Sequence, residues 1–379
     1  LLNVDTQDDS TNPEVRETAM KQGENEVHLS FLDKQNKWNS AEDAEEAARS
    51  IENTPNLTSL TLRGNTLGVE AGQRIARALE KCHDLKDCNW SDLFTGRLRS
   101  EIPVIVVGLC EGMMKAGAKI RSLDLSDNAF GPVGADSIKA FLESPSAFSL
   151  EELKLNNCGL GAGAVTVANS LKTLHHNAKA AGQKLNLKVI VAGRNRLEIP
   201  GATAFAEAIE LIQTIEEITV HQNGIHRPGM IALARGVGAC PNMKKLSVAD
   251  NVSGWEGALA FAKSLPKLQS LEVADFSDCL MKNKGCAALT KACLALPKLT
   301  KLDLSGAELT ADVATELIDL WRRKRAGDAV LCIAVNNFGD GFSNLRELAQ
   351  QGRDVDVGDT DDDCGSLDDD EDDGREADL

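Results

Sequence analysis

The sequence predicts an α/β solenoid in which short parallel strands alternate with helices. Two observations predict it. A leucine pattern recurs along most of the 379 residues, and hydrophobic residues make up 42% of the chain although aromatic residues make up only 4%, with no Tyr. Leu, Ala, Ile and Val must therefore form the core, which suits a stack of similar packing layers. The length allows two or three globular domains or one elongated array of repeats.

The repeated pattern is L-x-x-L-x-L-x-x-N-x-L. Three clear copies are Leu57, Leu60, Leu62, Asn65 and Leu67; Ile120, Leu123, Leu125, Asn128 and Phe130; and Leu150, Leu153, Leu155, Cys158 and Leu160. Later asparagines recur every 28 residues, at 195, 223 and 251. With weaker copies at Leu29, Leu85 and Leu268, we count about eleven units, which is a leucine-rich repeat of the long type. We expect an insertion in the unit that starts at Leu268, before Asp278 and Cys279.

Each unit begins with a strand and returns through a helix. The x-L-x-L residues alternate inward and outward as in a strand, and the asparagine side chain satisfies backbone groups where the chain turns away. Helical spacing of apolar residues predicts helices over 70–81, 135–142, 202–212, 230–237 and 311–321. Because helices are wider than strands, the stack should bend into a horseshoe with parallel strands on the concave face and helices on the convex face.

Charge and polarity divide the chain into three regions. We expect a polar, poorly ordered segment over 1–25, the repeat domain over 26–350, and an acidic, disordered tail over 351–379. The net charge is −17, and residues 354–379 hold 14 acidic residues against one Arg. The tail is either a solubilising segment or an electrostatic attractor for a basic partner. This acidity argues against nucleic-acid binding.

Several functional classes are not expected. The longest apolar stretch, Val104 to Cys110, is too short to span a membrane, and residues 1–26 lack the pattern of a secretory leader. The ten cysteines form no C-x-x-C pair, and the doublet His175 and His176 has no partner at ligand spacing, so we expect reduced buried thiols and no metal site. The chain also has no phosphate-binding loop and no nucleophile–histidine motif of an independent enzyme.

Two positions stand out as candidates for function. The unit at Leu85 loses its asparagine and continues as an expected loop over 92–103, where Gly96 precedes Arg97. A long loop of this kind presents a cation at a defined place, or it is simply solvated. In another unit, Cys158 occupies the asparagine position, so the preceding Asn157 is free to face outward. A neutral amide both donates and accepts hydrogen bonds.

These segments resemble the Ran GTPase-activating proteins. Residues 91–103 read SDLFTGRLRSEIP, and four further segments agree in order: LSDNAFGP at 125–132, LNNCGLG at 155–161, GRNRLE at 193–198 and QNGI at 222–225. Generic leucine-rich repeats share the Leu and Asn positions but not the F-T-G-R-x-x-x-E-I-P segment. The resemblance covers residues 25–350 and the acidic tail.

The resemblance implies stimulation of GTP hydrolysis on Ran in its GTP-bound form, in the cytoplasm, in support of nucleocytoplasmic transport. The chain would act as a monomer on the active site of its partner and would not be an enzyme itself. It would need no cofactor of its own, since Ran carries GTP and Mg²⁺. A Ran-binding protein could join the same complex. By the motif match, Asn157 approaches the catalytic glutamine of Ran, Arg97 assists without acting as an inserted arginine finger, and the remaining contacts are Phe94, Thr95, Gly96, Arg99, Asp127 and Arg194. The departure from the family pattern at Cys158 leaves Asn157 intact.

The alternative is a non-catalytic scaffold that binds a signalling, cytoskeletal or ubiquitin-ligase partner through its concave face. A scaffold predicts that Arg97→Ala and Asn157→Ala alter affinity alone, whereas an activator predicts that Asn157→Ala lowers the hydrolysis rate at saturation.

Overall fold

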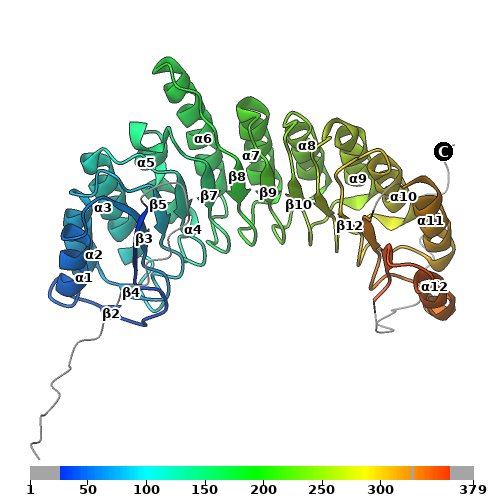
Figure 1. Ribbon diagram of the computed structural model, residues 1–379, viewed down its shortest axis with the longest axis horizontal. Helices are drawn as coiled ribbons and strands as arrows, with labels where there is room; N and C mark the ends of the chain where they lie inside the picture. Colours follow the sequence, from blue (N-terminus) through cyan, green and yellow to red (C-terminus); the bar gives the residue numbers. More distant parts are fainter. Residues whose placement is uncertain (1–25, 326–327, 359–379) are drawn as a thin grey trace, which may run out of the picture.

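A single curved sheet organises the molecule. The computed structural model describes residues 26–325 and 328–358, and its twelve-stranded sheet has the order β1-β3-β5-β6-β7-β8-β9-β10-β11-β12-β13-β14. The strand pairs are parallel, and the helices follow the outer side of the arc (Figure 1). The predicted leucine-rich repeat horseshoe is confirmed. The loops that follow the strands line one edge, which we call the rim.

The strands are short. In the main sheet they are β1 (Val27–Ser30), β3 (Leu57–Thr61), β5 (Asp87–Asn89), β6 (Ser122–Asp124), β7 (Glu152–Lys154), β8 (Val189–Val191), β9 (Glu217–Thr219), β10 (Lys245–Ser247), β11 (Val273–Asp275), β12 (Lys301–Asp303), β13 (Val330–Cys332) and β14 (Val355–Asp356). A separate pair near the start consists of β2 (Lys37–Trp38) and β4 (Thr66–Leu67).

The helices pack on their sequence neighbours. They are α1 (Glu45–Glu52), α2 (Val69–Leu79), α3 (Glu101–Ala116), α4 (Gly131–Ser137), α5 (Lys139–Leu142), α6 (Gly163–Ala180), α7 (Glu198–Ile212), α8 (Arg227–Val237), α9 (Gly254–Ser264), α10 (Lys282–Cys293), α11 (Ala311–Lys324) and α12 (Phe342–Ala349), with 3-10 turns at Pro145–Ala147, Leu265–Lys267 and Gly339–Gly341. The helix expected over 135–142 is divided at Ile138 into α4 and α5.

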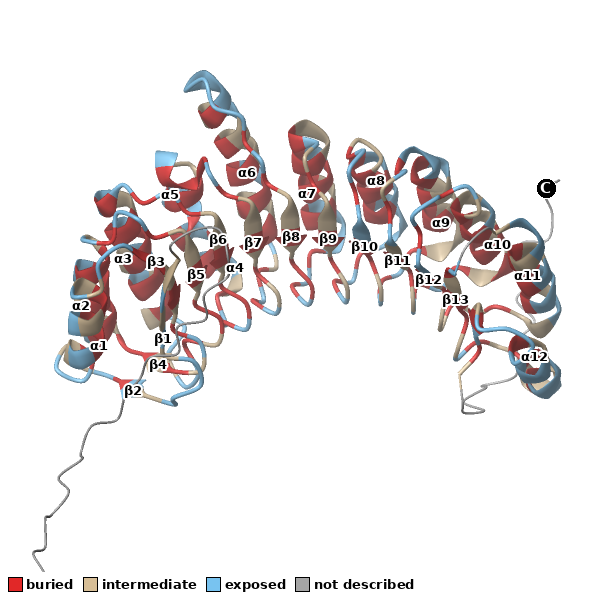
Figure 2. Cartoon of the chain, viewed as in Figure 1, coloured by how far each residue is buried: buried red, intermediate tan, exposed pale blue. Residues whose placement is uncertain are grey.

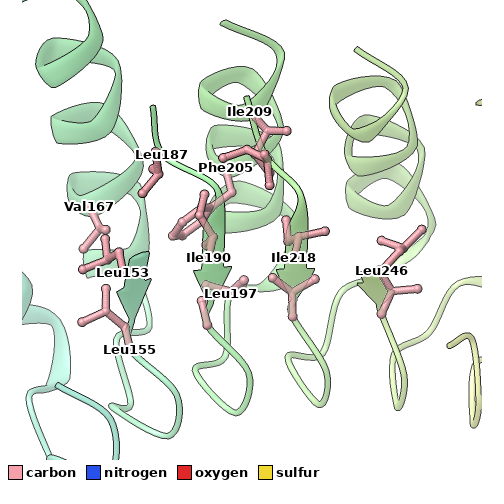
Figure 3. Close-up of a cluster of buried hydrophobic side chains, with 14 of the residues drawn as sticks. Leu153, Leu155, Val167, Leu187, Ile190, Leu197, Phe205, Ile209, Ile218 and Leu246 are labelled. Atoms are coloured by element: carbon pink, nitrogen blue, oxygen red, sulfur yellow. The ribbon is translucent and has the colours of Figure 1, made fainter. Parts of the chain in front are cut away.

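The core lies between the strand layer and the helix layer. The central residue of each three-residue strand is buried, and it faces the helices, as Figure 3 shows for Leu153, Ile190, Ile218 and Leu246. Buried positions therefore form a continuous band along the arc, with exposed positions on the loops and the outer helix faces (Figure 2). Repetition spreads burial over many similar layers, as a solenoid requires.

The asparagines of the repeat form a buried ladder. Asn223 accepts the backbone N–H of Asn195 with its Oδ1 at 2.8 Å, and Asn251 accepts that of Asn223 at 3.1 Å. Their Nδ2 groups donate to backbone carbonyls, including Val220 O for both. Each side chain therefore satisfies backbone groups that would otherwise be buried without partners. Asn128 and Asn195 belong to this ladder and have a structural role.

Two expectations about individual repeat units need correction. The unit at Leu268 contains no insertion, because Lys245 pairs with Val273 and Val273 with Lys301, 28 residues apart each time. Ala274 takes the place of the usual leucine there, which shifted the expected register. The loop expected over 92–103 ends earlier, since α3 begins at Glu101.

The sheet also continues past residue 350, where we expected the domain to end. Strand β14 pairs with β13 through Leu331 and Val355, and Arg322 holds Asp354 at 3.1 Å. The segment over 1–25 and the tail from 359 onward lie outside the described residues.

No helix among the described residues is long and apolar enough to cross a membrane. Nine cysteines lie within those residues, all buried and unpaired. The same part of the chain holds no group of three His, Cys, Asp or Glu side chains suited to a metal ion.

Candidate partner-binding rim

One residue per repeat turns outward at the rim. It is the residue immediately before the ladder position, and its backbone is left-handed, with φ between 45° and 59° at Asp92, Asp127, Asn157, Arg194, Gln222, Asp250 and Asp278. This conformation is costly for most residues and is tolerated best by Asn and Asp. The repeat therefore places a row of mostly polar side chains along the rim. The loops of the rim lie at the lower side of Figure 1.

Asp127, Asn157 and Arg194 occupy consecutive places in this row, after β6, β7 and β8. Their backbone N–H groups donate to the next repeat, from Asn157 to Gly193 O at 2.8 Å and from Arg194 to His221 O at 2.9 Å. All three side chains are exposed. The structure thus brings three of the predicted site residues together as an acid, an amide and a base.

Asn157 is held in place through Cys158. The Cys158 N–H donates to Asn195 Oδ1 at 3.0 Å, and its thiol donates to Leu125 O at 3.2 Å. Burial raises the pKa of the thiol to about 12, so it stays protonated and remains a donor at neutral pH. A cysteine therefore replaces the ladder asparagine without releasing the rim residue beside it.

Gly193 permits close packing next to Arg194. A Cβ at this position would lie 2.5 Å from His221 Nδ1 and 2.6 Å from Asn156 Oδ1. Since real side chains do not approach so closely, these two neighbours require a glycine. Nothing in the repeat pattern distinguishes Asn156 or His221, because their proximity depends on the register of three strands.

Arg97 does not point outward from its loop. It is half-buried, and its guanidinium donates to Thr66 Oγ1 at 2.8 Å, Thr66 O at 3.1 Å and Trp38 O at 3.3 Å. Thr66 Oγ1 in turn donates to Thr95 O at 2.8 Å. Arg97 therefore fastens its loop to the turn of a preceding repeat, a partner that sequence analysis missed.

The rest of this loop divides between core and surface. Phe94 was expected to contact the partner, but it is buried and its ring centre lies 6.4 Å from that of Phe130. Thr95, Gly96 and Arg99 are exposed. Because neighbouring strands lie about 5 Å apart and β5 is two strands from β7, this loop begins roughly 10 Å along the rim from the loop of Asn157.

A shallow groove of about 710 Å³ continues the rim beyond Arg194. Its lining combines apolar and acidic side chains and includes Ile199, Val252, Leu280, Asp250 and Asp278. Burial and the neighbouring carboxylates, Asp250 first among them, raise the pKa of Asp278. Ile199 lies in the first turn of α7, and Val252 and Leu280 lie in loops, so their meeting in one groove depends on the stacking of the repeats.

The chain is similar to known proteins in both sequence and fold. A family model described as Leucine Rich repeat matches residues 118–139. The chain is 54% identical over 346 residues to Ran GTPase-activating protein 2 of Caenorhabditis elegans, covering 90% of this chain and 36% of that protein. It is 50% identical over 195 residues to Ran GTPase-activating protein 1 of Xenopus laevis, covering 51% and 34%. The matched part of this chain thus spans about a third of the length of each of these two relatives.

Among solved structures, a chain of the yeast Rad7 and Elc1 complex aligns with a TM-score of 0.50 at 14% identity, covering 90% of this chain and 78% of that one. This likeness concerns the fold alone. Fold and rim define a leucine-rich repeat protein that presents a row of ordered side chains. Within that class, this chain is a relative of the Ran GTPase-activating proteins, and the resemblance seen in the sequence is confirmed.

Proposed function

We propose that this chain activates GTP hydrolysis by Ran. The observation that carries the proposal is the exposed amide of Asn157, fixed on the rim between Asp127 and Arg194. The names of the relatives support the choice of Ran.

The chemistry is shared between two proteins. The GTPase brings the nucleotide, Mg²⁺ and a glutamine that orients the attacking water. Asn157 contributes an amide that holds this glutamine in its productive orientation, and so lowers the barrier by positioning instead of by adding charge. Activity then resides in the partner's active site, and the chain needs no cofactor of its own.

Arg97 acts indirectly in this proposal. Its donors are engaged by Thr66 and Trp38, so its contribution is the shape of the loop that presents Thr95, Gly96 and Arg99 to the partner. This arrangement supports a mechanism without an arginine finger. Phe94 contributes by packing beneath the loop.

We place the action on the GTP-bound form, because the γ-phosphate orders the switch segments of a small GTPase. The chain would act as a monomer in the cytoplasm, with a Ran-binding protein as a further component of the complex, and would support nucleocytoplasmic transport.

The test is single-turnover hydrolysis of GTP on purified Ran with increasing amounts of this chain. A small GTPase from a different family serves as the specificity control. We expect acceleration by several decades on Ran alone. Tight binding to Ran·GTP without acceleration would instead favour a scaffold, and absence of binding would remove Ran as the partner.

A further inference from the structure

We infer that Asp127 is a positioning residue that sets the orientation of the Asn157 side-chain amide. The inference rests on the proposed function and assigns Asp127 a role other than direct contact with the GTPase. Asn157 Nδ2 donates to Asp127 Oδ1 at 3.0 Å across neighbouring repeats. Both side chains are exposed, so the bond lies at the surface that a partner would cover.

The backbone makes this bond a fixed feature of the rim. Asp127 and Asn157 share the left-handed conformation, with φ of 59° and 54°. The N–H of Asp127 donates to Asn156 O at 2.8 Å, which joins the two loops one residue from the side-chain bond. Buried Asn128 and Cys158 follow directly in the sequence. The two side chains therefore leave the rim at equivalent places on adjacent loops.

The chemistry of the pair selects one of two amide orientations. An ionised carboxylate only accepts hydrogen bonds, so the amide must turn its NH₂ group toward Asp127 and its oxygen away. The hydrogen bonds within the described residues leave Asn157 Oδ1 without a donor, and Arg194 on the other side makes no hydrogen bond to it. An acceptor oxygen is thus presented at the open rim.

This orientation suits a glutamine as the target. A glutamine side chain has two N–H donors and one carbonyl oxygen. If Asn157 accepts from the NH₂ group, the glutamine oxygen remains available to accept from the attacking water. The reversed amide would donate to that oxygen and compete with the water. Asp127 therefore favours the productive arrangement without touching the partner's reacting atoms.

Other groups near the pair have different partners. Asp124, on β6, accepts the N–H of Ser126 at 2.9 Å, and Ser126 Oγ accepts the N–H of Asn156 at 3.1 Å. These bonds shape the loops beneath the rim. The carboxylate that meets the amide is that of Asp127.

A double-mutant cycle distinguishes positioning from contact. We would measure the saturating single-turnover rate and the half-saturating concentration on Ran for Asp127→Ala, Asn157→Ala and the double variant. Asp136→Ala is the control, because Asp136 is an exposed aspartate on α4, outside the rim. We expect Asp127→Ala to lower the saturating rate roughly tenfold, the scale of one hydrogen bond to a charged group. It should have no further effect once Asn157 is alanine.

Asp127→Asn should fall between the wild type and Asp127→Ala, because its amide oxygen still accepts from Asn157 but its NH₂ group also allows the reversed pairing. An effect of Asp127→Ala confined to the half-saturating concentration, or one that persists fully in the Asn157→Ala background, would overturn the inference in favour of direct contact.

A spectroscopic arm is independent of GTP hydrolysis. In protein labelled with ¹⁵N at asparagine, the side-chain amide signals of Asn157, assigned by their loss in Asn157→Ala, should move in Asp127→Ala and stay in place in Asp136→Ala. Unmoved signals in Asp127→Ala would overturn the inference by themselves. A wild-type chain that fails to accelerate hydrolysis would refute the proposed function, and the amide signals would still decide the role of Asp127.

Discussion

Asn195 Oδ1 accepts the backbone N–H of Cys158 at 3.0 Å, so a buried residue of one repeat fixes the loop of the repeat before it. The same side chain donates to Leu155 O at 2.7 Å. Asn157 lies between these two anchored residues in the sequence. The ladder that stabilises the solenoid therefore also sets the geometry of the candidate site.

Asn195→Ala should lower the free energy of unfolding by about 2–4 kcal/mol, because buried backbone groups at Cys158 and Leu155 lose their partner. Urea denaturation followed by circular dichroism measures the change. Asn169→Ala, at an exposed position on α6, is the control and should change stability by less than about 0.5 kcal/mol. Equal losses in the two variants would contradict a special role for the ladder.

Arg97→Ala should raise the half-saturating concentration on Ran roughly tenfold and leave the saturating rate within about threefold, since it releases a loop fastened by hydrogen bonds. Arg97→Lys should not restore the wild type, because an ammonium group cannot reproduce the planar set of donors. Thr66→Val, which removes the shared hydroxyl, should give the same kind of defect. Loss of the saturating rate in Arg97→Ala but not in Thr66→Val would indicate a directly catalytic arginine.

The ion pairs between helices α1 and α2 should stabilise the fold less in acid. Arg74 joins α1 to α2 by donating to Glu45 at 2.7 Å and to Glu52 at 2.8 Å. These bonds, with one from Arg49, lower the pKa of Glu45 from 4.5 to about 2. The stabilisation is present above pH 4.5, where the unfolded chain is ionised, and is lost as pH falls toward 2.

Arg74→Met removes this stabilisation, so its urea midpoint should lie below that of the wild type at pH 6, and the difference should shrink at pH 3. An equal difference at both pH values would show that Arg74 acts through packing of its stem alone.

Removal of residues 359–379 should slow association with Ran in low salt. These residues carry twelve acidic side chains and one Arg, a net charge of −11. Stopped-flow association should be several-fold slower at low ionic strength and equal to the wild type near 0.5 M salt, where charges are screened within about 4 Å. The truncation retains β14, so the saturating rate should not change. An unaltered association rate in low salt would leave the tail as a solubilising segment.

The repeat made most of the fold predictable. Leucine spacing identifies the strands, and the position of Asn128 or Asn195 identifies the turn, because each unit solves the same packing problem. The expected register was wrong for the unit at Leu268, because its strand packs with different side chains. Ala274 replaces the expected leucine, and the rings of Phe276 and Phe261, 5.1 Å apart, pack beside it.

The site was predictable only in part. Asn157, Asp127 and Arg194 share a repeat position, so their neighbouring places on the rim follow from the pattern. The direction of Arg97 does not, because its acceptor Thr66 lies 31 residues earlier and its engagement depends on the path of one irregular loop. The motif match places Phe94 among the partner contacts, whereas its side chain is buried beside Phe130.

The most direct test of the account is the single-turnover rate of GTP hydrolysis on Ran at saturating concentrations of the wild type and of Asn157→Ala. We expect the wild type to accelerate hydrolysis by several decades. The saturated rate of Asn157→Ala should be lower by at least about tenfold, as expected for a lost positioning contact. Equal saturated rates for the two proteins, with only the half-saturating concentration changed, would contradict it.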